Sequence, residues 1–231
     1  MSTSLSSAAP SPAHDAAGPG TTPIAHEAIE LVNLKELAST RVPAVLRQLA
    51  TMVHAVWGHC TDEFASPSQA EDVIRRRLEA GDEALFVALG RDDVLVGTGS
   101  IGHDDFYDGF SRSNRIDPGY VGRDLFTAKA WRGIVIDGLK VWEQLLEARL
   151  RWIAGRGGTQ LSVFTEPGRV DLAAIYGRVG AVVLHRGLDH RRLGRGSITM
   201  LGYPVRRALQ ELAALRQKRR SAEMAPYGRQ A

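Results

Sequence analysis

The sequence predicts an α/β protein with a mixed central sheet of about six or seven strands and flanking helices. Three observations support this class. Residues 120–187 alternate short β-rich runs with longer runs whose apolar residues recur at helical spacing. Residues 84–101 hold two β-rich runs separated by a turn signal. The chain has 231 residues and is 44% hydrophobic, enough to bury one sizeable core.

The first predicted elements are one strand and two helices. Residues 28–34 alternate enough to form a strand, and 37–57 carry apolar residues at helical spacing. Pro43 stands in the first turns of that helix, where proline is tolerated. A second, charge-rich helix is predicted from Ser66 to Ala80, and Gly81 closes it.

An antiparallel hairpin and a polar loop follow. Residues 84–89 and 94–101 are β-rich runs, and Gly-Arg-Asp-Asp between them predicts the turn. Residues 102–119 are polar and acidic, and loops of this length inside a domain are usually functional or mobile. We expect this loop near a substrate cleft. Asp104 and Asp105 are candidate substrate-binding residues, because clustered carboxylates attract a cationic amine, although turns favour aspartate for local reasons as well.

The second half of the chain predicts four more strands and three helices. The spacing of its apolar residues changes repeatedly between the pattern typical of strands and the pattern typical of helices. The strands are 120–129, 159–165, 181–187 and 197–203, and the helices are 138–155, 170–179 and the amphipathic 205–220.

Composition sets the domain organisation and excludes several classes. Residues 1–27 are poor in large apolar side chains and predict a disordered tail, followed by a domain over 28–204 and a helix with a tail over 205–231. Cys60 is the only cysteine, which excludes an intramolecular disulfide and fits a cytoplasmic protein. We expect no signal peptide, no membrane span and, for lack of a recognised motif, no nucleic-acid partner.

Two motifs in the second half resemble the GNAT superfamily of N-acyltransferases. The first is Trp-Arg-Gly at 131–133, at the end of a strand, and the second is the run AIYGRVGA at 174–181. The resemblance covers roughly residues 29–204. The first motif departs from the family's Arg-x-x-Gly-x-Gly, because Val135 and Asp137 replace its glycines. We therefore expect Asp137 to cap a helix that starts near Gly138, with an insertion at the phosphate loop.

The resemblance implies a GNAT-type domain that uses acetyl-CoA or another acyl-CoA as co-substrate, without a metal. It also implies that the two central parallel strands, 120–129 and 159–165, splay apart and open a slot for the donor. A β-bulge in the first strand would turn the backbone N–H groups of 126–129 toward the acyl carbonyl. The residues expected to contact the donor are Phe126, Thr127, Ala128, Lys129, Arg132, Gly133, Ile134, Val135, Ile136, Asp137, Gly138 and Tyr176.

Tyr176 matches the tyrosine that the family places near the departing thiol, so the resemblance implies a general acid. A half-buried tyrosine used for packing is the other interpretation. Asp124 and Glu166 are the candidate general bases, although each is also the kind of carboxylate found at surfaces and helix caps. His103 is a weaker third candidate.

The predicted function is transfer of an acetyl or other acyl group from coenzyme A to a primary amine of a small molecule, by direct attack in a ternary complex. Two alternatives stay open. One is a transferase of this fold that takes a longer acyl chain or an acyl carrier protein as donor. The other is a binding protein of this fold that catalyses no reaction. A homodimer is also left open.

Overall fold

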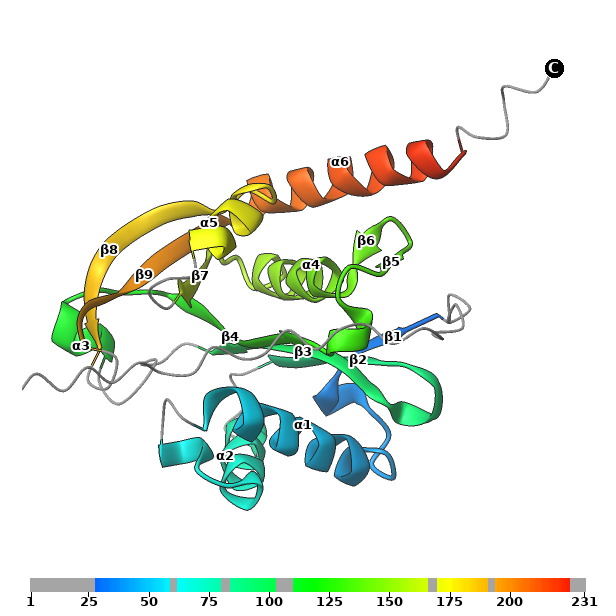
Figure 1. Ribbon diagram of the computed structural model, residues 1–231, viewed down its shortest axis with the longest axis horizontal. Coiled ribbons are helices and arrows are strands. Elements are labelled where there is room, and N and C mark those ends of the chain that lie inside the picture. Colours follow the sequence, from blue (N-terminus) through cyan, green and yellow to red (C-terminus); the bar gives the residue numbers. More distant parts are fainter. Residues whose placement is uncertain are drawn as a thin grey trace, which may run out of the picture.

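The computed structural model describes residues 28–58, 62–79, 84–102, 110–165, 170–190 and 194–224. The tail predicted over 1–27 lies outside these residues. Figure 1 shows a central sheet with helices on both faces. The predicted α/β class, with its mixed sheet, is confirmed.

The sheet has seven strands in the order β1-β2-β3-β4-β7-β9-β8. Only β4 and β7 pair in parallel, and every other neighbouring pair is antiparallel. The hairpin predicted over 84–101 is confirmed as β2 and β3. The strands are β1 Glu30–Asn33, β2 Ala84–Leu89, β3 Leu95–Gly102, β4 Tyr120–Thr127, β7 Gln160–Thr165, β8 Val182–His190 and β9 Gly194–Pro204.

The helices divide between the two faces. In Figure 1, α1 (Val42–Trp57) and α2 (Pro67–Glu79) lie below the sheet, and α4 (Val141–Ala154) lies above it with α5 (Val170–Gly177) and α6 (Val205–Met224). A short helix, α3 (Phe110–Asn114), replaces part of the loop predicted over 102–119. Asn114 exchanges two hydrogen bonds with the backbone of Asp189, so this segment is tied to β8.

Short elements complete the chain. They are the 3-10 turns η1 (Leu34–Glu36), η2 (Asp62–Phe64), η3 (Arg91–Asp93) and η4 (Lys129–Trp131), and the strands β5 (Val135–Ile136) and β6 (Leu139–Lys140). The helix predicted from residue 37 begins five residues later, because a bend and a turn occupy residues 37–41. Pro43 falls in the first turn of α1, as predicted.

Arg41 joins three separate segments at the end of the sheet. Its guanidinium donates to Glu30 on β1 and to Asp93 in the β2–β3 turn. These hydrogen bonds lower the pKa of both carboxyl groups. The edge strand β1 is thereby tied both to the hairpin and to the start of α1.

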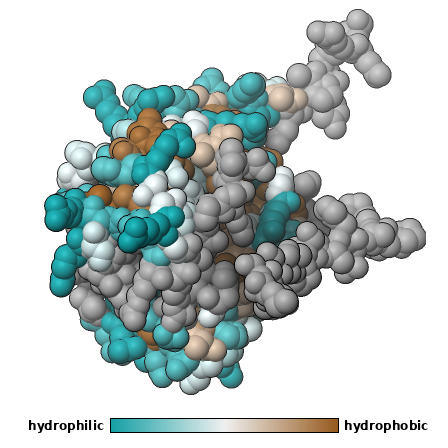
Figure 2. Space-filling view, turned by 60° about the vertical axis from the view of Figure 1, so that its left-hand side comes forward, coloured by the Kyte–Doolittle hydropathy of each residue, from teal (hydrophilic) through white to brown (hydrophobic). Residues whose placement is uncertain are grey.

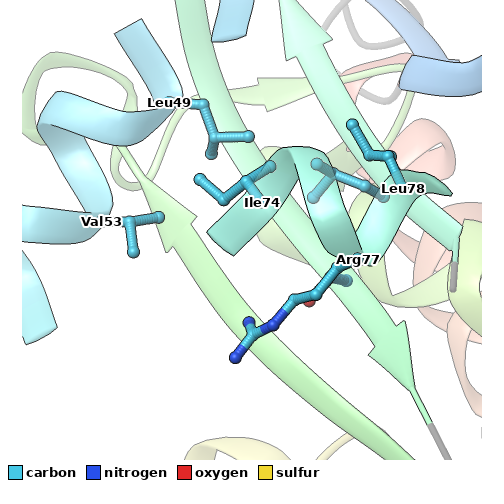
Figure 3. A pocket seen from close by; sticks show the side chains of 7 residues that line it. Leu49, Val53, Ile74, Arg77 and Leu78 are labelled. Atoms are coloured by element: carbon cyan, nitrogen blue, oxygen red, sulfur yellow. The ribbon is translucent and has the colours of Figure 1, made fainter. Parts of the chain in front are cut away.

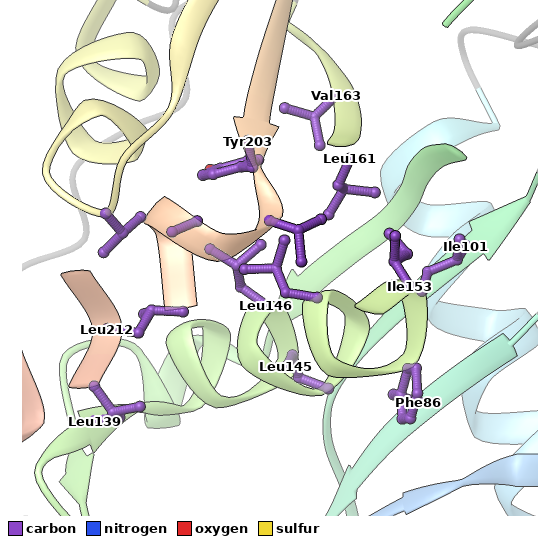
Figure 4. Packing of buried hydrophobic residues seen from close by; sticks show 14 of the residues in the cluster. Phe86, Ile101, Leu139, Leu145, Leu146, Ile153, Leu161, Val163, Tyr203 and Leu212 are labelled. Carbon is purple, nitrogen blue, oxygen red and sulfur yellow. The ribbon is translucent and has the colours of Figure 1, made fainter. Parts of the chain in front are cut away.

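Each face of the sheet has its own apolar core. One core lies between the sheet and α1 and α2, and the other lies between the sheet and α4, α5 and α6. Figure 4 shows the second core, in which Leu145, Leu146 and Ile153 of α4 point toward side chains of the strands and of α6. Leu212 of α6 is fully buried there, so this helix packs on the domain along its apolar side.

Three glycines let α4 approach the sheet closely. A Cβ atom built on Gly97 of β3 would lie 3.0 Å from Leu145 Cδ1, and one on Gly99 would lie 3.3 Å from Arg149 Nε. On β4, a Cβ atom at Gly122 would lie 2.7 Å from Arg149 Nη1 and 3.0 Å from Val163 Cγ1. The guanidinium of Arg149 is fully buried in the room that these glycines leave.

We predict that Gly122→Ala lowers the free energy of unfolding by about 1–3 kcal/mol, because the added methyl group overpacks the layer beside Arg149. Urea unfolding followed by circular dichroism measures the change. Gly177→Ala is the matched control, since a Cβ atom there meets nothing within 4 Å. Equal stability of the two variants would contradict this packing.

Candidate active site

The central strands β4 and β7 separate after a short paired segment. They pair only at Tyr120 with Leu161 and at Val121 with Ser162. Beyond these residues β4 runs on to Thr127 and β7 to Thr165 without a further pair. The predicted splay of the central strands is therefore confirmed. It opens the sheet at the carboxyl ends of parallel strands, where α/β folds commonly bind ligands.

A β-bulge lies in β4 beside the splay. Thr98 pairs with Phe126 and Ser100 pairs with Arg123, so Gly99 alone on β3 opposes two residues, 124 and 125, on β4. The predicted bulge in this strand is confirmed. A bulge bends its strand and changes the direction of the backbone groups that follow it.

The direction of the backbone beyond the bulge narrows the predicted set of donor-facing amides. The N–H of Ala128 donates to Val96 O across a distance of 2.8 Å, so it points toward β3 and not toward the splay. This corrects the expectation for Ala128. Because backbone groups alternate along a strand, the N–H of Thr127 faces the splay. The Oγ1 atom of Thr127 is buried and makes no hydrogen bond with any residue that the structure describes.

Arg132 lies just after the end of β4, exposed to solvent. Its Nε donates to Thr127 O at 3.1 Å, and its guanidinium lies 5.7 Å from the centre of the Phe126 ring. Gly133 follows at φ +90°, in the left-handed region that favours glycine. The chain turns there and leaves Arg132 at the mouth of the splay.

Residues 129–140, called the phosphate loop because the resemblance places the donor's phosphates there, form more than a simple turn, and Asp137 does not cap α4. Asp137 and Gly138 form a two-residue turn between β5 and β6, with φ values of 55° and 75°. Asp-Gly is a preferred sequence for such turns, so this signal was present in the sequence. Helix α4 begins at Val141 and not near Gly138. Gln144 of α4 donates to the carbonyls of Ile136 and Leu139 and fixes the hairpin to the helix.

The first turn of α4 carries a carboxylate that the sequence reasoning missed. Glu143 accepts a hydrogen bond from the N–H of Lys140 at 2.7 Å, and its side chain is 3% exposed. Arg219 of α6 binds the same carboxylate through two nitrogens, at 2.5 and 3.0 Å. Glutamate at the third helical position is a known N-terminal signal, so the spacing from residue 140 was a usable clue.

Glu147, one turn further along α4, binds two arginines. Arg216 of α6 donates to both of its oxygens, at 3.0 and 2.5 Å, and Arg151 donates at 2.8 Å. Burial raises the pKa of the Glu147 carboxyl group, but the hydrogen bonds and charges of the two arginines outweigh burial and lower it overall. The ionised form is therefore the one that the fold stabilises.

Tyr176 lies in an aromatic layer on the α4 face of the sheet. Its ring centre is 5.9 Å from that of Trp142 on α4 and 6.1 Å from that of Tyr203 on β9. Burial raises the pKa of the Tyr203 phenol well above its ordinary value; Tyr176 adds to this effect and Arg149 opposes it. Tyr176 itself is only half-buried, so it combines a packing role with access to solvent. Its role as an acid stays a prediction.

The structure does not describe the side chains of the remaining predicted catalytic and substrate-binding residues. Glu166, Asp104, Asp105 and His103 lie outside the described residues, as does Cys60. Asp124 belongs to the bulge of β4, but its side chain is not described. The general base and the acidic substrate loop therefore stay predictions.

A small cavity lies on the opposite face, between the sheet and helices α1 and α2. Its volume is about 10 Å³, which suits a single water molecule. Figure 3 shows Leu49 and Val53 of α1 and Ile74, Arg77 and Leu78 of α2 around it; Leu85 and Ser100 complete its lining. Ser100 pairs with Arg123, the residue before the bulge, so the cavity reaches the sheet close to the splay.

The described part of the chain contains neither a metal-binding cluster nor a membrane-spanning helix. No group of three or more His, Cys, Asp or Glu residues there is arranged to hold a metal ion. None of the helices in the same residues combines the length and apolar character needed to cross a bilayer.

The amino-acid sequence matches no protein-family model and no curated protein. Solved structures do match. A putative GNAT acetyltransferase from Desulfovibrio desulfuricans is 16% identical with a TM-score of 0.53, over 77% of this chain and 99% of that chain. An aminoglycoside 6'-acetyltransferase type Ii is also 16% identical with a TM-score of 0.53, over 77% of this chain and 97% of that chain. Spermidine N-acetyltransferase from Vibrio cholerae, in complex with CoA and spermine, is 10% identical with a TM-score of 0.53, over 78% of this chain and 98% of that chain.

At sequence identities of 10–16%, this structural likeness shows the fold and nothing beyond it. The chain has the fold of the GNAT acetyltransferases, and the resemblance stated from the two motifs is confirmed at that level.

Because the pKa of Glu147 is lowered in the folded protein, its contribution to stability is present above its unfolded value of about 4.5 and is lost as pH falls through the folded value. We predict that the wild type loses stability more steeply than Glu147→Gln between about pH 5 and pH 3. Thermal unfolding across this range measures it. Glu211→Gln, which changes an exposed residue of α6, is the control and should follow the wild type. Parallel curves for Glu147→Gln and the wild type would contradict the prediction.

Proposed function

We propose that this protein is an N-acyltransferase that moves an acetyl or other acyl group from coenzyme A to a primary amine of a small molecule. The observation that carries the proposal is the splay of β4 from β7 with a bulge beside it, in a GNAT fold. The similar solved structures include one in complex with CoA and spermine and an aminoglycoside acetyltransferase. The aminoglycoside and the spermidine in the names of these proteins support an amine acceptor of small size.

The residues at the splay fit an acyl-CoA donor in part. The backbone N–H of Thr127 and its buried Oγ1 atom offer polar groups to the amide-bearing arm of the donor. Arg132 and Lys129, both exposed after β4, supply positive charge for phosphates. Asp137 and Glu143 oppose this charge, so the fit depends on what neutralises them.

In the proposed reaction the neutral amine attacks the thioester carbonyl, a C–N bond forms and the C–S bond breaks. A backbone N–H directed by the bulge would stabilise the oxyanion that develops on the carbonyl oxygen. Tyr176 would give its phenolic proton to the departing thiolate. The proton lost by the ammonium group would pass to Asp124 or Glu166, directly or through water. Asp104 and Asp105 would draw the cationic acceptor to the site.

A second donor class is favoured by one specific observation. The phosphate loop carries Asp137 in a turn and Glu143 at the start of α4, where the donor's phosphates are expected. An acyl chain delivered by an acyl carrier protein brings fewer phosphates to this loop. A protein that binds the donor without catalysis is the third candidate.

The observations that support the proposed reaction do not bear on the oligomeric state or the cellular location of the protein. Among the described residues, the exposed large hydrophobic side chains are Val94, Ile175 on α5 and Val183 on β8. Figure 2 shows hydrophobic surface gathered in the upper part of one face of the molecule, among hydrophilic residues. A homodimer and a cytoplasmic location are kept as predictions.

We predict that acetyl-CoA binds the purified protein and that Arg132→Ala raises the Kd about tenfold or more, because a charged contact with phosphate is lost. Calorimetric titration measures both values, and longer acyl-CoA donors run in parallel report the preferred chain length. The control is Arg76→Ala, an exposed residue of α2 on the opposite face. Failure of the wild type to bind any acyl-CoA would overturn the proposed donor and turn attention to carrier proteins.

We predict that Tyr176→Phe lowers kcat by about a hundredfold while the donor Kd changes little, because the ring still packs but no longer supplies a proton. Release of free thiol, followed with acetyl-CoA and a panel of primary amines, measures the rate. Tyr120→Phe is the matched control, since Tyr120 packs against Trp152 at the closed end of the splay. Unchanged kcat in Tyr176→Phe would assign that residue to packing alone.

A further inference from the structure

The region where the donor's phosphates are proposed to bind contains carboxylates as well as cations. Asp137 lies in the β5–β6 turn and Glu143 in the first turn of α4. A carboxylate close to a polyanion repels it, and the positive end of a helix dipole is weakened by a carboxylate on its own first turn. Any affinity for phosphates at this place therefore depends on groups that offset these two charges.

Arginines of the C-terminal helix α6 offset both of them. Arg219 forms a two-nitrogen ion pair with Glu143, a carboxylate that is 3% exposed. Arg220 forms an ion pair with Asp137, and these two side chains are 54% and 57% exposed. Planar guanidinium groups suit such two-point contacts with carboxylates.

Helix α6 also holds the shape of the turn through backbone contacts. Arg219 donates to Gly138 O and Arg216 donates to Asp137 O, each at 3.3 Å. Gly138 lies so close to the helix that a Cβ atom built on it would be 2.8 Å from Arg216 O. The β5–β6 turn is thus enclosed by a helix that lies about eighty residues further along the chain.

Helix α6 supplies most of the positive charge that faces these carboxylates. Arg216, Arg219 and Arg220 pair with Glu147, Glu143 and Asp137. Arg151 of α4 also pairs with Glu147, and Arg216 Nε also lies 3.7 Å from Asp137. Lys129, Arg132 and Lys140 then remain as the cations of the phosphate loop, and none of them forms an ion pair with a described residue. Removal of Arg219 takes away the arginine that pairs with Glu143, and removal of Arg220 leaves Asp137 only a longer contact with Arg216 Nε, at 3.7 Å.

We infer that Arg219 and Arg220 are positioning residues for donor binding, which act through Glu143 and Asp137 by neutralising the carboxylates of the phosphate loop. This inference rests on the proposed function, because the donor is taken to be an acyl-CoA. It assigns to α6 a role in the active site, although none of its side chains needs to touch the reacting atoms.

The exposed pair, Arg220 and Asp137, provides the sharpest test because its loss should hardly alter stability. We predict that Arg220→Gln raises the Kd for acetyl-CoA about three- to tenfold at low salt, whereas Asp137→Asn lowers it, because one negative charge is removed from the loop. The double variant has the same net charge at this pair as the wild type and should return to the wild-type Kd. The difference should shrink when salt is added, because the charges involved are near the surface. Calorimetric titration of the full chain at two salt concentrations measures these values.

The buried pair gives an independent check. Arg219→Gln and Glu143→Gln should both lower the melting temperature, since each breaks the same ion pair, but only Arg219→Gln should weaken acetyl-CoA binding. Arg207→Gln, on an exposed position near the start of α6, is the control for the loss of one positive charge. A merely structural role would make both members of each pair weaken binding equally, and that result would overturn the inference.

Failure of the inference is distinguishable from failure of the proposed function. If the wild type binds acetyl-CoA and the two members of each pair act alike, the inference falls and the proposed function stands. If the wild type binds no acyl-CoA, the proposed donor falls and the inference falls with it. Opposite effects of Arg220→Gln and Asp137→Asn on the donor Kd support both.

Discussion

The parting of β4 from β7 after two paired residues is the constraint on which the candidate site depends. Strands that stay paired would present no edge to a ligand, and strands that never paired would not hold the two halves of the sheet in one layer. The glycines of β3 and β4 allow α4 to lie directly over the point of divergence. The bulge at residues 124 and 125 then directs the backbone of β4 beyond it.

Helix α4 connects this opening to the rest of the molecule. Its buried Arg149 lies against β4 at Gly122, the first residue beyond the paired segment, and its apolar side forms the centre of the second core. Its first turn meets the β5–β6 hairpin and α6. Burying a guanidinium group costs free energy unless polar contacts compensate it. The fully buried Arg149 is therefore a position where substitutions in the surrounding layer should be felt.

The departures from the GNAT motif have a consistent electrostatic pattern. Val135 and Asp137 replace glycines of the family motif, and the loop forms a small hairpin at that place. The carboxylates of the hairpin and of α4 are matched by arginines of α6. Three of the five arginines of α6 make paired contacts with carboxylates of α4 and of the hairpin. The same pairs distinguish this loop from a plain glycine-rich phosphate loop.

The sequence by itself determined the order of the main elements, because apolar periodicity, the hairpin turn at 90–93 and the AIYGRVGA motif are local signals. It also indicated that Arg132 follows one of the two central strands. It did not determine that Asp137 lies in a hairpin turn, although Asp-Gly is a preferred turn sequence. Aspartate is equally favoured at helix N-caps, so the local sequence allows both positions. Only the tertiary structure decided which partners Glu143, Glu147 and Arg149 have around them. Contacts between α4 and α6 join residues far apart in the chain, and no local pattern encodes which charge will meet which.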